Sequence, residues 1–236
     1  MSAKIWYLYH SGFAVKTDKH FLIFDYWKDT GGGLKNGAIN PDELVDEDVI
    51  VFASHVHGDH YNPEILNWRG KIPKLRIILS DDIPPADGAF MVGKRQILTQ
   101  PDFLLETFTS TDEGVAFLLD IDGLRIYHAG DLNWWHWAGE SAKYNKDMEY
   151  SYKGQIDLLG NKPIDLAFVP VDPRLEDSYY LGIDYLMSAV DVNYAVPMHF
   201  GDNADVVDRL LSSPAAEYYR DKIVALTKRG QSAIID

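Results

Sequence analysis

The stretch Ser54-His55-Val56-His57-Gly58-Asp59-His60 places three of the chain's eight histidines and one aspartate within seven residues. His55 and His57 are two apart, so in an extended segment both imidazoles point to the same face and can close on one ion. Gly58 lets the backbone turn, after which Asp59 and His60 can project toward a second ion. The pattern predicts a metal centre, in which Asp59 would also act as a catalytic residue that orients the nucleophile or carries its proton.

The segments around this cluster indicate the fold that carries it. Val49 to Ala53 is wholly apolar, as is typical of a strand buried on both faces, and it leads directly into His55. Aromatic and β-branched runs from Ile5 to Tyr9 and from His20 to Phe24 predict an N-terminal β-meander. Strands dominate the first half and helices follow, which favours an α/β (α+β) fold of two sheets flanked by helices. Helical spacing is expected over residues 62–68, 141–159, 183–190 and 204–211.

The histidine cluster resembles the H-x-H-x-D-H signature of the metallo-β-lactamase superfamily, and other landmarks follow in that family's order. Asp25 ends an early strand, Asp131 closes Tyr127-His128-Ala129-Gly130-Asp131, and His199 closes Val196-Pro197-Met198-His199. The resemblance implies a four-layer αββα sandwich. It also implies that His55 and His57 bind a first metal, that Asp59, His60 and His199 bind a second, and that Asp131 bridges the two.

These landmarks, together with His-Ser-Gly-Phe from His10 onward, resemble more closely the branch of the superfamily that contains ascorbate-6-phosphate lactonase. At branch level the resemblance implies a ring-opening hydrolase. A shared fold does not fix a substrate, so β-lactamase activity itself is not predicted.

One departure from the family concerns the first metal, which usually has a third histidine. No histidine occurs from Tyr61 to Tyr127. Asp112 or Thr111 could offer an oxygen in its place, which would shift the preference from zinc toward manganese or iron. Otherwise only Asp59, His60, Asp131 and His199 hold an ion firmly. The expected cofactor is therefore one or two divalent metal ions, with zinc first.

Several residues are expected to act around the ligands. His128 alternates off the ligand face of its strand, and we expect it to support the ligands from behind, as we do Asp25 and His10. Trp134 and Arg174 are candidate substrate-binding residues because each follows a strand end near the centre. The alternatives are hydrophobic packing for Trp134 and an ion pair for Arg174.

Composition narrows the class of protein. With 236 residues, of which 46% are hydrophobic, the chain is expected to form a single domain, residues 1–236, with a helical insertion near 134–160 that caps the cleft or makes an oligomer contact. A net charge of -14 disfavours nucleic acid and anionic membranes as partners, leaving a small-molecule substrate and the option of a homo-oligomer. The sequence has no cysteine, so histidine, carboxylate and water must bind any metal. Without a signal-like or membrane-spanning segment, a cytoplasmic location is expected.

The leading hypothesis is a hydrolase in which metal-bound hydroxide cleaves a small ester, lactone, amide or phosphoester. The alternative is a metal-binding or sensory module of the same fold, impaired in catalysis by the missing histidine.

Overall fold

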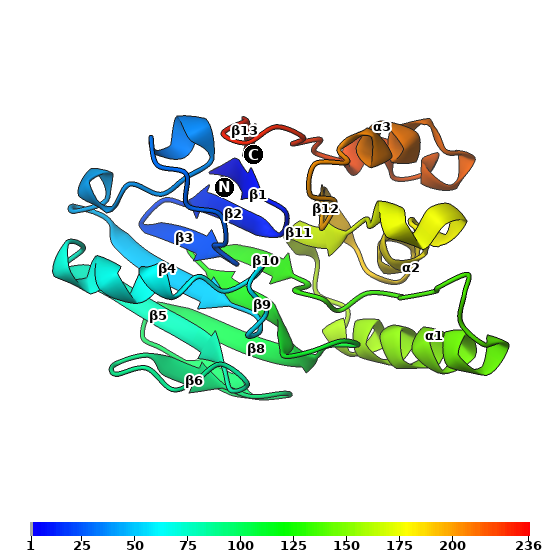
Figure 1. Cartoon of the computed structure of the whole chain (residues 1–236), viewed down its shortest axis with the longest axis horizontal. Coiled ribbons are helices and arrows are strands. Elements are labelled where there is room, and N and C mark those ends of the chain that lie inside the picture. The colour runs from blue at the N-terminus through cyan, green and yellow to red at the C-terminus, as the bar shows by residue number, and fades with distance from the viewer. Residues whose placement is uncertain (1) are drawn as a thin grey trace.

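Two sheets of strands pack face to face in the computed structural model, which describes residues 2–236 (Figure 1). The first sheet has the order β13-β1-β2-β3-β4-β5-β6 and the second the order β12-β11-β10-β9-β8-β7. The first sheet comprises β1 Ala3–Tyr9, β2 Gly12–Lys16, β3 His20–Phe24, β4 Asp48–Ala53, β5 Lys74–Ser80, β6 Phe90–Val92 and β13 Ser232–Ile235. The second comprises β7 Ile97–Thr99, β8 Phe103–Thr109, β9 Val115–Ile121, β10 Leu124–His128, β11 Ile164–Pro170 and β12 Val192–Met198.

Strand direction determines where the functional loops meet. The predicted β-meander is present, since β1, β2 and β3 pair antiparallel, whereas β3, β4 and β5 are parallel. In the second sheet β10, β11 and β12 are parallel. Parallel strands end at the same edge of a sheet, so the segments after β3 and β4 meet, as do those after β10, β11 and β12.

Aromatic side chains fill the space between the sheets. Phe13 and Phe168 lie with ring centroids 4.3 Å apart, and Phe24 stacks on Phe52 at 4.7 Å. All four are at most 1% exposed, so they anchor the sheet interface. Three α-helices, α1 Ala142–Ile156, α2 Leu181–Ala189 and α3 Asp205–Ser212, pack onto the same core and lie together on one side of the molecule (Figure 1).

The other face of the first sheet is covered without an α-helix. Trp68 and Ile65 bury their side chains against Val49, Val51 and Ile77. They belong to a 3-10 segment, Pro63–Gly70, so the helix expected at 62–68 is of the tighter type. The other 3-10 turns are Leu34–Asn36, Pro41–Glu43, Asp157–Leu159, Pro173–Ser178, Pro214–Ala216 and Arg220–Lys222.

The remaining helices agree closely with the sequence pattern. The helix expected over 141–159 is α1, and Ser141 caps it by accepting a hydrogen bond from the Tyr144 backbone N–H at 3.1 Å. Tyr152 and Ile156 face the core, where the Tyr152 hydroxyl donates to the Gly182 carbonyl at 2.7 Å. The two-sheet α/β fold is thus confirmed. Within residues 2–236, no helix combines the length and the apolar character that crossing a bilayer requires.

A charged cluster ties the two sheets together at the beginning of β3. The His20 ring nitrogens lie 2.8 Å from an Asp122 carboxylate oxygen and 2.9 Å from one of Asp102. Arg76 donates to Asp102 at 2.8 Å. The Arg76 hydrogen bond, helped by His20, holds the pKa of Asp102 well below its usual range even though burial opposes this. Asp102 is therefore more stable as a carboxylate in the folded chain.

We expect Asp102→Asn to lower the free energy of unfolding by about 1 kcal/mol at pH 7, a modest value because Asp102 is partly exposed. A depressed carboxyl pKa contributes stability above the unfolded value that is lost as the pH falls through the folded one. The difference from the unsubstituted chain should therefore shrink as the pH is lowered from about 5 toward about 2. Urea unfolding across this range, with the exposed Asp18→Asn as control, measures it, and a pH-independent difference would contradict the assignment.

Candidate metal centre

The predicted histidine cluster lies on the loop after β4. His55 and His60 are fully buried, whereas His57 and Asp59 reach the surface. The His55 Nε2 and His57 Nδ1 atoms are 3.1 Å apart, so these two imidazoles converge as their spacing predicts. The loop is anchored by Asp25, which accepts hydrogen bonds from the Ser54 backbone N–H at 2.8 Å and its hydroxyl at 2.7 Å.

Asp131 lies at the middle of the centre. Its Oδ1 is 3.2 Å from Nε2 of both His60 and His199, and its Oδ2 is 3.5 Å from the His55 Nε2. Burial alone would raise the pKa of Asp131, but His60 and His199 hold it well below the usual range. Against the opposing effect of burial, Asp131 raises the pKa of His199 to about 9. A cation that binds to these imidazole nitrogens must displace the protons that they carry.

The ligand atoms form three groups, each with all its atoms within 4.8 Å of one another. One joins His57, Asp112 and Asp131, and another joins His55, His60 and Asp131. The third joins Asp59, His60 and His199 with His10. All the candidate ligands expected from the sequence are therefore brought together, and Asp131 lies between the two ends of the centre.

Unsatisfied buried atoms show that these residues fit a metal. His60 Nε2 and Asp131 Oδ1 lie 3.2 Å apart, yet neither has a hydrogen-bond partner. Such buried polar atoms are costly unless a third partner satisfies both. Imidazole nitrogens and carboxylate oxygens are the ligands used by zinc, manganese and iron, so this donor set suits one or two such ions.

Asp112 reaches the centre because its loop packs directly on the histidine loop. The Val115 backbone N–H donates to the Ser54 carbonyl at 3.0 Å. Gly114 has a φ of 65°, and a Cβ there would lie 2.5 Å from the His55 Cβ, so only glycine allows this approach. The Thr111 hydroxyl already donates to the Asn133 carbonyl at 2.7 Å. Of the two oxygen candidates, Asp112 is the one grouped with His57.

His10 lies beside the ligands rather than behind them. Its ring is 4.1 Å from that of His199, and its Nε2 is 3.5 Å from an Asp59 carboxylate oxygen. Burial, together with His199 and His60, lowers the pKa of His10 to about 3, which leaves the imidazole neutral. Both ring nitrogens lack a hydrogen-bond partner. His10, expected to support the ligands from behind, is therefore placed where it could itself ligate an ion.

The backbone is held in an uncommon conformation at three of these positions. His10, Asp25 and His199 have φ values of 57°, 44° and 66°, in the left-handed region that non-glycine residues rarely adopt. Such strain persists where the surrounding structure over-determines it, and it clusters at functional sites. Here the strained backbone places the side chains of His10 and His199 beside each other and that of Asp25 against His60.

Asp25 and His128 lie behind the ligands, as expected. Asp25 is fully buried and its Oδ2 is 2.7 Å from the His60 Nδ1. His128 accepts from the Gly130 N–H at 3.1 Å, and its Nε2 lies 2.9 Å from the Ser11 carbonyl. The two residues thereby orient His60 and the loop that carries Asp131.

We expect Asp25→Asn to weaken metal binding by about 10- to 100-fold, because the carboxylate fixes the orientation and basicity of His60. Losing one charged partner of a buried pair should also lower the free energy of unfolding by about 3 kcal/mol. Isothermal titration with Zn²⁺ and urea unfolding measure the two effects. The matched control is Asp18→Asn, which should change neither, and unchanged affinity in Asp25→Asn would refute the role.

Asp172 is a functional residue that the sequence reasoning missed. It follows β11, and its Oδ2 lies 2.9 Å from the His199 Nδ1. Hydrogen bonds from His199 and Arg174 outweigh burial and lower the pKa of Asp172 to about 2. The sequence feature that could have identified Asp172 is its position directly after a parallel strand, because that edge of the sheet also carries Asp131. Asp172 thus orients His199 much as Asp25 orients His60.

A pocket of about 170 Å³ opens onto the centre. Asp112, Asp131 and His199 line it from the metal side. The remaining walls are Thr111, Trp135, Trp137, Tyr144 and Arg174. Trp135 also donates its indole N–H to the Asp131 carbonyl at 3.0 Å, which fixes the wall to the ligand loop.

Of the two residues expected to bind substrate, Arg174 lies at the pocket and Trp134 does not. Arg174 lines the pocket and is also ion-paired, since its Nε lies 2.9 and 3.0 Å from the Asp172 carboxylate oxygens. Trp134 lines a separate hollow with Glu149, and Lys153 lies 4.4 Å from its ring. Its neighbours Trp135 and Trp137 take the place expected for Trp134, because the segment after Asp131 turns within these few residues.

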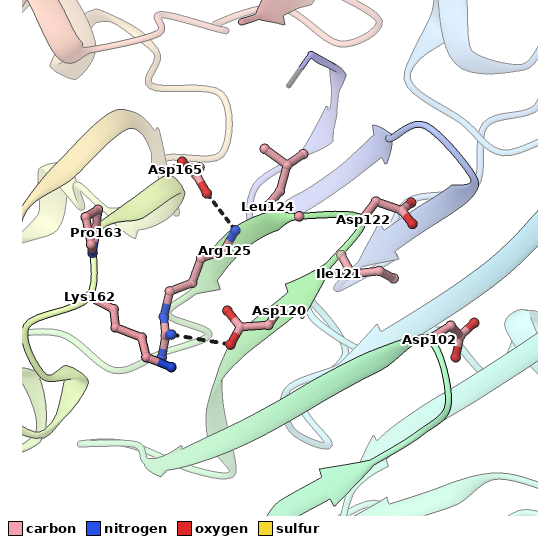
Figure 2. A pocket seen from close by; sticks show the side chains of 10 residues that line it. Asp102, Asp120, Ile121, Asp122, Leu124, Arg125, Lys162, Pro163 and Asp165 are labelled. Atoms are coloured by element: carbon pink, nitrogen blue, oxygen red, sulfur yellow. Dashed lines mark hydrogen bonds and ion pairs between the residues drawn. The ribbon is translucent and has the colours of Figure 1, made fainter.

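A larger cavity of about 520 Å³ lies at the opposite end of β10, away from the ligands (Figure 2). Its charged groups satisfy one another: Arg125 donates to Asp120 at 3.3 Å, and the Arg125 backbone N–H donates to Asp165 at 2.8 Å. It is lined by four aspartates, among them Asp102, but by no histidine, and none of the ligands predicted from the sequence lies in it.

Comparison with solved structures supports the fold. Igni18, a metallo hydrolase from Ignicoccus hospitalis, is 17% identical with a TM-score of 0.62, and the alignment covers 100% of this chain and 99% of that one. CmlA, a diiron β-hydroxylase from Streptomyces venezuelae, is 12% identical with a TM-score of 0.53 over 84% of this chain and 44% of its own. At such identities the similarity is one of fold, and the fold hosts more than one reaction.

Sequence comparison gives the family. A UPF0173 metal-dependent hydrolase from Pyrococcus abyssi is 27% identical over 214 residues, which span 84% of either chain. One from Bacillus velezensis is 29% identical over 220 residues, or 84% of this chain and 85% of the relative. Residues 4–136, more than half of the chain, match the model of the beta-lactamase superfamily domain. The chain therefore belongs to the beta-lactamase superfamily, with the metallo-β-lactamase fold.

Proposed function

We propose that the chain is a metal-dependent hydrolase that cleaves a small ester, lactone, amide or phosphoester at this centre. The observation that carries the proposal is the cluster of imidazoles and carboxylates, some of whose buried atoms have no hydrogen-bond partner. The cluster lies beside a pocket that a small molecule can enter. Relatives that align over 84% of the chain are metal-dependent hydrolases, which supports the same reaction class. The ring-opening lactonase reaction is one member of that class.

The roles of the residues follow from their positions. When bound, divalent ions would polarise the scissile group and lower the pKa of a water molecule. Asp59 is partly exposed and lies 3.5 Å from His10, so it can orient the attacking water and pass its proton to the leaving group. Trp135 and Trp137 exclude water from the pocket, and Arg174 can hold a substrate carboxylate or phosphate beside Trp137.

The metals proposed are zinc, with manganese or iron favoured if the Asp112 oxygen completes the first site. A small molecule is the proposed partner, since the net charge of -14 repels nucleic acid and anionic membrane. We propose that the protein acts in the cytoplasm and that a homo-oligomer is an option for its assembly.

The test is turnover by protein purified without chelators and loaded in turn with Zn²⁺, Mn²⁺ and Fe²⁺. Esters, lactones, amides and phosphoesters are assayed in parallel, with metal-stripped protein and His57→Ala as controls. Metal-dependent turnover of one class, lost in the controls, supports the hydrolase. Metal binding without turnover of any class would instead favour a sensory module, the alternative that the missing histidine suggests.

A further inference from the structure

A groove of about 670 Å³ runs along α1 beside the metal pocket. It is lined by Tyr144, Met148, Ser151 and Gln155 of α1 and by Leu158 of the 3-10 turn that follows. These positions are three or four residues apart, so they form one stripe along the helix. The adjoining side of α1 is used for packing, because Tyr152 and Ile156 are buried in the core. Met148 packs against the same core from the stripe, whereas Tyr144 and Ser151 are exposed.

Apolar side chains are exposed along this groove, beside the charged side chains of Arg95 and Asp147 that also line it. Tyr150 is 82% exposed, Leu158 46% and Tyr144 39%, and all three line this groove. Single exposed apolar side chains are ordinary, whereas several gathered in one hollow indicate a binding site. The far wall is fixed to the helix, since Gln155 accepts a hydrogen bond from the Thr109 N–H at 3.0 Å.

The groove adjoins the metal pocket. Tyr144 and Thr111 line both of them, so the two hollows meet at these residues. The metal pocket measures only about 170 Å³, which accommodates a scissile group but little more. Ligand pockets typically measure ~300–1,000 Å³, a range that the groove satisfies and the metal pocket does not.

We propose that the groove along α1 binds the apolar arm of the substrate, an acyl or aryl chain attached to the group cleaved at the metal pocket. This inference rests on the proposed hydrolase activity and names its substrate class as amphiphilic acyl or aryl esters and lactones. A second copy of the chain is the competing occupant. The boundary that the groove shares with the metal pocket at Tyr144 and Thr111 favours a single small molecule that reaches both spaces.

The test fills the groove and leaves the metal pocket unaltered. Ser151 is exposed and lies in the groove, so Ser151→Trp should obstruct it. Ser188→Trp is the matched control, because Ser188 is exposed on α2 outside the groove. Metal-loaded chain and variants are assayed with p-nitrophenyl acetate and p-nitrophenyl octanoate. We expect Ser151→Trp to lower kcat/KM for the octanoate by at least about tenfold, through lost burial of methylenes, and to leave the acetate within about twofold.

Equal effects on both esters, or none on either, would overturn the inference. So would a change in the oligomeric state of Ser151→Trp by light scattering, which would identify the groove as a contact between copies. If neither ester is cleaved, calorimetry with sodium octanoate decides the groove, and the hydrolase proposal is decided separately by the screen of esters, lactones, amides and phosphoesters. Binding that Ser151→Trp weakens at least about tenfold and Ser188→Trp does not would uphold it, and absence of binding to the unsubstituted chain would refute it.

Discussion

Asp131→Asn should release both metal ions and lower kcat/KM by at least about a thousandfold, because two-metal sites depend on the anion that holds the pair. The Asp131 oxygens lie within 3.5 Å of His55, His60 and His199, and no other carboxylate among residues 2–236 approaches all three. Asparagine keeps the shape and removes the charge. Bound metal measured by plasma mass spectrometry, together with turnover, gives the result.

Circular dichroism provides the control for this substitution. The unsubstituted and Asp131→Asn chains should give the same far-ultraviolet spectrum, since Asp131 lies on a loop after β10 rather than within a strand. Retention of two ions by a folded Asp131→Asn chain would show that the carboxylate does not bridge them.

Asp112→Ala should remove one ion and leave the other. Asp112 is grouped with His57 and Asp131 but not with Asp59 or His199, so only the first site loses a ligand. We expect the affinity of that site to fall by at least about 100-fold. Asp112→His should restore binding and shift the preference toward Zn²⁺, because imidazole is a softer ligand than carboxylate. Calorimetric titration with Zn²⁺ and Mn²⁺ separates the two sites.

Glu113→Ala is the comparison for this experiment. Glu113 approaches His57 at 3.8 Å, but both side chains are about half exposed. We expect this variant to bind metal as the unsubstituted chain does. If Glu113→Ala loses the ion and Asp112→Ala keeps it, the oxygen ligand has been assigned to the wrong neighbour.

Local spacing was sufficient to predict the centre but not its surroundings. The residues from His55 to His60 are adjacent in sequence, so their convergence follows from one short loop. Asp131 and His199 were predicted from the resemblance to the metallo-β-lactamase superfamily, and the parallel pairing of β10, β11 and β12 brings both to one edge. Asp172 occupies an equivalent position but belongs to no familiar motif, and its role follows only from its contact with His199.

Other features depend on three-dimensional packing that spacing does not encode. Which tryptophans after Asp131 face the pocket depends on a turn within Asn133-Trp134-Trp135, and in the structure they are Trp135 and Trp137. His10 lies beside the ligands with a left-handed backbone conformation, which the sequence pattern does not predict for a histidine. The covering of the first sheet by 3-10 turns likewise reflects how Trp68 fits its hydrophobic face rather than helical periodicity.

The central claim is a two-metal centre completed by an oxygen ligand. The most direct test is the metal content of untagged protein purified without chelators, measured by plasma mass spectrometry beside His57→Ala. We expect about two ions per chain, of which His57→Ala loses one, since His57 belongs to a single group of ligands. One ion that is indifferent to His57→Ala, or no bound metal, would contradict it.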